Sequence, residues 1–149
     1  MRSIRTVALL AILPMGIATA QAPGVQWGPA PPVFPAGAKF AVLAGDPSKA
    51  GEYTVRLEMP NGYTIAPHYH PTDEHITVIQ GTFLVGMGDA VDAAKSRTLK
   101  MGDFATAMAN QHHFAIARGR TIVQVNGIGP FQLTYVNPAD DPQKKVSKK

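Results

Sequence analysis

Hydrophobic and polar residues alternate with a period of two along much of the 149-residue chain. The clearest run covers residues 53–59, where four apolar side chains alternate with Thr54, Arg56 and Glu58. Such alternation is typical of a β-strand with one buried face. Further short apolar or β-branched runs predict strands at residues 39–44, 74–80, 82–87, 97–100, 104–108, 113–117, 121–126 and 131–136.

Glycine, proline and asparagine separate these predicted strands. Residues 45–48 (GDPS) and 60–62 (PNG) are strong turn signals, and Gly81 is expected to break the run between residues 74 and 87. Tight turns are also expected at residues 101–103 and 118–120. One helical turn is expected at residues 89–96, and regular structure is expected to end after Val136. Nine or ten short strands with almost no helix predict an all-β antiparallel fold. Closure into a single-domain jelly-roll β-barrel would remove exposed strand edges.

The N-terminus has the pattern of an export signal. Arg2 and Arg5 precede an apolar stretch that ends in Ala18-Thr19-Ala20, so we predict a signal peptide at residues 1–20. The stretch is shorter than the roughly 20 residues of a membrane-spanning helix, which disfavours an anchor. The mature protein is therefore expected in the periplasm or outside the cell, with no membrane association after cleavage.

The rest of the chain divides by composition into three parts. Residues 21–37 form a proline- and glycine-rich arm, expected to lie on the barrel or on a neighbouring subunit. Residues 38–137 are the predicted barrel, and residues 138–149 are a basic, flexible tail.

Charge and cysteine content exclude several functions. Between Lys39 and Arg120, eight basic residues balance eight acidic ones, so the body lacks the cationic surface of a nucleic-acid-binding protein. The chain contains no cysteine, which excludes thiol catalysis and thiolate ligands. Histidine and carboxylate therefore remain as the strong metal ligands.

Three histidines and one glutamate form the candidate site. His68 and His70 are two residues apart on an extended segment, which places both side chains on one face. A turn at residues 71–73 leads to Glu74, and a hairpin there would bring the carboxylate beside the imidazoles. A third histidine has to come from the His112-His113 pair. Imidazoles with a carboxylate suit a borderline divalent metal, whereas an isolated H-x-H pair is more often a surface feature.

The spacing of these residues resembles the cupin superfamily. Gly62, His68, His70, Glu74 and Gly81 occupy every defined position of the first cupin motif. The second motif is partial: it runs from Gly102 to His113, but Met108 and Asn110 replace its proline and glycine, and Ala117 replaces its asparagine. The resemblance covers residues 39–136. It also implies a homodimer formed through the N-terminal arm or an edge strand.

The resemblance implies a ligand set of His68, His70, Glu74 and His113 around one divalent transition metal, with Fe, Mn, Ni, Cu and Zn as candidates. The altered turn before His113 leaves His112 as an alternative ligand. By the same resemblance, Glu74 is also a candidate general base. The second-motif departures at residues 108–110 put this part of the ligand set in doubt.

Cupins serve many functions, so several hypotheses stay open. An exported metal-dependent enzyme acting on a small organic molecule is favoured, with dioxygenase-type oxidoreductase chemistry first. The alternatives are a non-catalytic metal- or ligand-binding module and a metal-dependent decarboxylase or lyase. Cavity size distinguishes them, because a space of about 300 Å³ or more favours an enzyme or a sensor.

Overall fold

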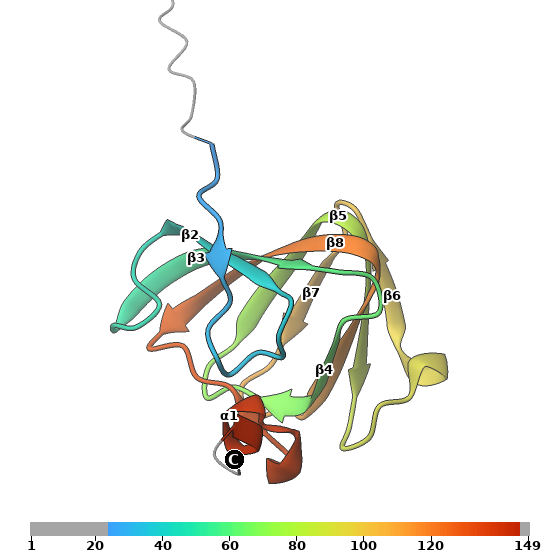
Figure 1. Ribbon diagram of the computed structural model, residues 1–149. Coiled ribbons are helices and arrows are strands. Elements are labelled where there is room, and N and C mark those ends of the chain that lie inside the picture. Colours follow the sequence, from blue (N-terminus) through green and yellow to red (C-terminus); the bar gives the residue numbers. More distant parts are fainter. Residues whose placement is uncertain (1–23, 147–149) are drawn as a thin grey trace, which may run out of the picture.

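The computed structural model describes residues 24–146 of the chain (Figure 1). The predicted signal peptide at residues 1–20 lies outside the described residues, and the predicted domain boundaries stay predictions. Within the described part, no helix has the length and apolar character needed to span a membrane.

Nine strands and three short helical segments make up the described fold, which confirms the prediction of an all-β, jelly-roll protein. The alternating pattern at residues 53–59 lies in β3, where every apolar member is buried. The strands are β1 (Gly28–Pro29), β2 (Lys39–Ala44), β3 (Gly51–Met59), β4 (Thr64–Tyr69), β5 (Glu74–Met87), β6 (Arg97–Lys100), β7 (Phe104–Ala107), β8 (His113–Gly129) and β9 (Thr134–Tyr135).

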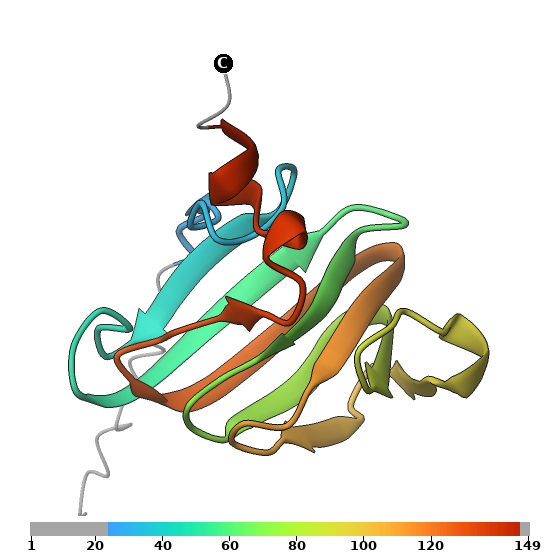
Figure 2. The same cartoon turned by 90° about the horizontal axis from the view of Figure 1, so that it is seen from below.

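The strands form one curled antiparallel sheet whose two halves share β5 and β8 (Figure 2). In one half, the order is β1-β2-β3-β8-β5-β7, with the second part of β8 paired to the first part of β5. In the other half, the first part of β8 lies between β4 and the second part of β5. The bend between the halves lets the inner faces of both enclose one hydrophobic core.

Two predicted breaks do not end strands. Both β5 and β8 continue through the glycines where turns were expected, Gly81 and Gly119. Gly81 instead has a positive φ of 80° and marks a shift in the β5–β8 register, as a β-bulge does. The bulge bends the strand without ending it, so β5 contributes to both halves of the sheet.

The predicted helical turn at residues 89–96 is confirmed as the 3₁₀ helix η1 (Ala93–Lys95), which Asp92 caps. The expectation that regular structure ends after Val136 is wrong. A second 3₁₀ helix, η2 (Pro138–Asp140), is followed by α1 (Pro142–Val146). Proline at the first position of each suits a helix start, which is why these steps begin helices here.

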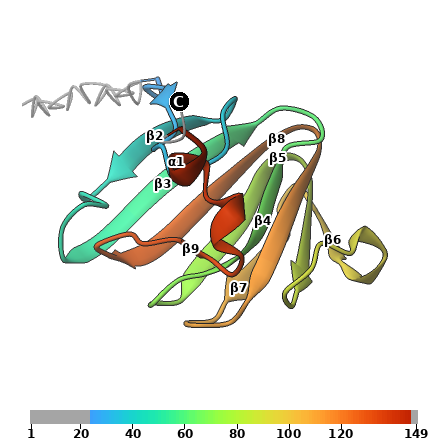
Figure 3. The same ribbon diagram turned by 60° about the horizontal axis from the view of Figure 1, so that its bottom comes forward.

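The N-terminal arm lies on the barrel of its own chain. Phe34 is buried in the core cluster, and the backbone of Ala30 hydrogen-bonds to Ala38. The arm and α1 lie side by side at one end of the molecule (Figure 3), and Pro142 lines the same groove as Pro32. The arm and α1 therefore lie against each other on the same end of the barrel.

Candidate metal centre

The structure brings together the four residues that the first and second motifs indicate. His68 lies in β4, and His70 follows directly after that strand. Glu74 begins β5 and His113 begins β8. All four side chains are buried on the inner face of the sheet. No pairing joins β4 to β5 among the described strands, so the short turn at residues 71–73, and not a hairpin ladder, brings Glu74 to His70.

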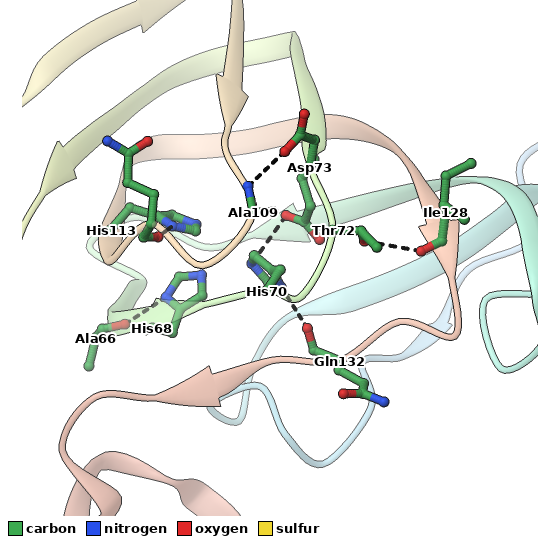
Figure 4. A network of polar contacts seen from close by, with 11 residues as sticks. Ala66, His68, His70, Thr72, Asp73, Ala109, His113, Ile128 and Gln132 are labelled. Atoms are coloured by element: carbon green, nitrogen blue, oxygen red, sulfur yellow. Dashed lines mark hydrogen bonds and ion pairs between the residues drawn. The ribbon is translucent and has the colours of Figure 1, made fainter.

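Backbone carbonyls orient all three imidazoles (Figure 4). The Nδ1 atom of His68 lies 2.7 Å from the carbonyl oxygen of Ala66, and that of His113 lies 2.9 Å from the carbonyl of Gln111. His70 Nδ1 lies 2.7 Å from the carbonyl of Gln132. A carbonyl only accepts, so each Nδ1 carries the proton and each Nε2 offers a lone pair. Metal-binding histidines are commonly fixed in this way.

The three lone pairs converge. One ring nitrogen of each of His68, His70 and His113 lies within 4.8 Å of the others, and the rings of His68 and His113 have centroids 4.2 Å apart. His70 Nε2 is buried and has no hydrogen-bond partner. A buried polar atom without a partner is costly, and a metal ion would satisfy it. The residues therefore fit a bound divalent metal.

Glu74 stands beside this triad. Its Oε2 lies 3.3 Å from His70 Nε2, but the group of mutually close ligand atoms includes the histidines alone. Since Nε2 and a carboxylate oxygen are both acceptors, the contact requires a proton or a cation between them. The Tyr53 hydroxyl also donates a hydrogen bond to Glu74.

Burial favours the uncharged forms of the four side chains in the metal-free centre. Burial lowers the pKa of His68 well below its ordinary value, and the nearby imidazoles of His113 and His70 lower it further. Burial also lowers the pKa values of His70 and His113. Burial raises the pKa of Glu74 to about 7, although His113 and Tyr53 oppose this. Neutral imidazoles are the form that binds metal, and a carboxyl with a pKa near neutrality can exchange protons.

The irregular second motif keeps its geometry. Asn110, at the position where the motif has glycine, has a φ of 60°, and its backbone N–H donates to the carbonyl of His70. Asparagine tolerates this left-handed conformation better than other side chains. The turn therefore places His113 in the cluster. His112 points elsewhere, with its Nδ1 2.6 Å from Asp89 and its ring stacked on Tyr69.

A small, apolar cavity of about 50 Å³ adjoins the centre. Ile76, Phe83 and Val85 line it, whereas Val78 is buried elsewhere in the core and Met108 is exposed. Arg56 donates to Gln124 and is not among the lining residues. Sequence reasoning missed Phe34, Phe40, Phe131 and Leu133. The remaining lining residues are Val55, Ile65, Ala115, Val123, Val125 and the four residues of the centre.

A protein-family model described as the ChrR cupin-like domain matches residues 16–120 of the chain. Curated protein sequences give no match to it. Among solved structures, a putative acetylacetone dioxygenase from Methylibium petroleiphilum is 22% identical with a TM-score of 0.60, covering 91% of this chain and 90% of that one.

Two further solved structures share the fold. KdgF from a Halomonas species is 23% identical, with a TM-score of 0.53 over 69% of this chain and 86% of that chain. An oxalate oxidase is 21% identical, with a TM-score of 0.53 over 72% of this chain and 59% of that chain. The family match spans both cupin motifs up to the middle of β8, and these structures have the same fold. The chain therefore belongs to the ChrR cupin-like domain family, within the cupin superfamily.

Proposed function

We propose that this cupin is a metal-dependent enzyme that oxidises a small, neutral organic molecule with dioxygen, a 1,3-diketone being the leading substrate class. One observation carries the proposal. Three buried imidazoles present lone pairs to one point, His70 Nε2 lacks a partner there, and Glu74, with a pKa of about 7, lies beside them.

The cavity supports a neutral substrate. Its described lining contains no lysine or arginine, and Glu74 is its one carboxylate. An anionic substrate would meet apolar walls and an acidic side chain without a basic partner, which makes its burial costly. Among the activities that the structural neighbours' names give, a diketone therefore suits this cavity better than oxalate does.

A divalent metal at this site would supply Lewis-acid stabilisation of negative charge on a substrate oxygen. His68, His70 and His113 would hold it through Nε2, with each Nδ1 anchored by a carbonyl. Glu74 accepts the proton between the two carbonyl groups of the diketone at a carboxylate oxygen, and Tyr53 keeps that carboxylate in place. The apolar walls exclude water from the reacting carbanion. Dioxygen is the oxidant, and both of its atoms end in the products, a carboxylic acid and a 1,2-dicarbonyl compound.

The test begins with metal content. Elemental analysis of the purified protein should give about one equivalent of metal, and a His68→Ala/His70→Ala variant should give none. The loaded protein should then consume one dioxygen per molecule of a small diketone in an oxygen electrode. Loaded protein that leaves dioxygen untouched across small diketones and catechols would contradict the enzymatic proposal.

A non-catalytic metal-holding module is the second candidate, and the cavity volume favours it. About 50 Å³ is far below the roughly 300 Å³ at the lower end of ligand pockets. This candidate predicts tight metal binding without oxygen consumption in the same assay.

Export is part of both proposals. Mass spectrometry of protein recovered from outside the cytoplasm tests it, with an N-terminus at Gln21 expected.

A further inference from the structure

Three phenylalanines from distant parts of the chain close one side of the cavity. Phe34 belongs to the arm, Phe40 to β2, and Phe131 to the segment between β8 and β9. The Phe34 ring stacks on Phe131 with centroids 5.8 Å apart, and it lies tilted against Phe40 at 6.4 Å. Together they form a continuous aromatic wall.

The three rings differ in what else depends on them. Phe131 also lies 5.7 Å from the ring of His70, and the next carbonyl, that of Gln132, orients His70. Phe40 is part of the β2–β3 ladder. Phe34 lies outside the strands, and its ring contacts among the described residues are with the other two phenylalanines. Phe34 therefore has no ring contact with a histidine of the centre and no ladder partner, which makes it the ring of choice for substitution.

The backbone on both sides of Phe34 is held in place. The Tyr135 hydroxyl donates to the carbonyl of Val33 at 2.8 Å, and the Tyr63 hydroxyl donates to the carbonyl of Pro35. The Phe34 N–H donates to the carbonyl of Pro31 at 2.9 Å. Since both tyrosines are buried in the barrel, the ring is presented to the cavity from a fixed position.

We propose that Phe34 sets the size limit for molecules that reach the candidate metal centre. The choice of small neutral ligands rests on the proposed function. Truncating a buried aromatic side chain leaves a void that its surroundings fill only partly. A dry apolar void on the order of 150 Å³ is enough to bind benzene. Phe34→Ala should therefore admit flat apolar molecules that the wild type excludes.

The first experiment uses metal-free protein, so it is independent of the proposed function. Thermal unfolding of wild type, Phe34→Ala and Phe104→Ala is followed with and without benzene. Phe104 is the matched control because its ring is exposed on the outer face. Benzene should raise the Tm of Phe34→Ala alone, by roughly 2–4 °C. An equal response of all three proteins, or no response of Phe34→Ala, would overturn the proposal. Phe34→Leu, a smaller change, replaces Phe34→Ala if the latter does not fold.

The second experiment tests access to the metal. Visible spectra of Co²⁺-loaded proteins are recorded with azide, a small ligand, and with 4-phenylimidazole, a bulky one. Azide should change the spectra of wild type and both variants, whereas 4-phenylimidazole should change that of Phe34→Ala alone. A wild-type spectrum that responds to both ligands would overturn the size limit. If no protein takes up Co²⁺, the proposed metal site fails, while the benzene result still decides the role of Phe34.

Discussion

At the scale of single residues, the negative charge of Glu74 destabilises the metal-free protein but favours a bound metal. Its pKa rises from 4.5 to about 7 on burial, so folding favours the protonated form. A raised folded-state pKa contributes stability below the unfolded value, and that stability is lost as pH rises through the folded value. Between pH 4.5 and a pH above 7, the resulting loss in the free energy of unfolding is on the order of 3 kcal/mol.

Glu74→Gln should therefore stabilise the metal-free protein at pH 8 by a few kcal/mol and have little effect near pH 4.5, because the amide cannot ionise. Urea unfolding of both proteins at the two pH values measures this. The same substitution should weaken metal binding, since it removes an anionic neighbour of His70. A Glu74→Gln protein that is less stable at pH 8 without metal would contradict the buried, protonated carboxyl.

The sequence was sufficient to place His68, His70, Glu74 and His113 in one candidate site, but it did not predict the aromatic wall beside them. His68, His70 and Glu74 are close together in the chain, so strand geometry and a short turn place them together. Phe34 and Phe131 stack although 97 positions separate them, and no local period reports such a contact. The choice of His113 over His112 depended on Asn110 adopting a positive φ, which the residue type permits but does not require.

At the scale of elements, Gly81 allows β5 to serve both halves of the sheet. Its φ is 80°, and a Cβ there would lie 2.5 Å from the carbonyl oxygen of Arg120. Gly102 has a similar φ of 88°, but a Cβ there would have open space. A comparison of alanine substitutions at the two glycines therefore separates the cost of left-handed backbone strain from the cost of a steric clash. The sequence marked both as turn positions, but it could not show that one continues a strand.

Gly81→Ala should destabilise the protein more than Gly102→Ala. Left-handed strain alone costs about 1–3 kcal/mol for a non-glycine residue, and Gly81→Ala adds a clash with backbone that cannot move aside easily. Urea unfolding of both variants measures the difference. Equal losses in the two variants would show that β8 shifts freely at Arg120.

The arm is an element that buried tyrosines attach to the barrel. Burial raises the pKa of Tyr63, and the nearby Tyr135 raises it further. Burial, together with the charges of Asp141 and Asp140, raises the pKa of Tyr135 to about 12. Both hydroxyls donate to arm carbonyls, so each must keep its proton to hold the arm. The stability they supply is present below pH 10 and is lost as pH rises through the folded values.

A Tyr63→Phe/Tyr135→Phe variant should accordingly lose less stability than wild type between pH 9 and pH 11.5. At pH 8 it should be less stable by about 1 kcal/mol for each missing hydrogen bond. Urea midpoints at the three pH values measure both effects. Parallel pH profiles for the two proteins would contradict the tethering role of these hydroxyls.

At the scale of the whole molecule, the candidate centre joins three strands that lie in different parts of the sheet. His68, Glu74 and His113 belong to β4, β5 and β8, and His70, which follows β4, is tied through Gln132 to the segment that leads to β9. The arm contacts this segment through Phe34, which stacks on Phe131. Without cysteine, the fold has no disulfide to couple these elements, so a bound metal would be its single strong cross-link.

Metal binding should therefore stabilise the entire barrel and not the site alone. A ligand that binds the folded state at a thousand times its Kd adds about 4 kcal/mol, which for a chain of this size raises the Tm by roughly 10 °C or more. Calorimetry of metal-free protein with and without Zn²⁺, which undergoes no redox change, should give one transition shifted as a whole. The His68→Ala/His70→Ala variant should show no shift. Unchanged wild-type unfolding in saturating Zn²⁺ would mean that the three imidazoles hold no metal, because a ligand confined to the folded state must raise its stability.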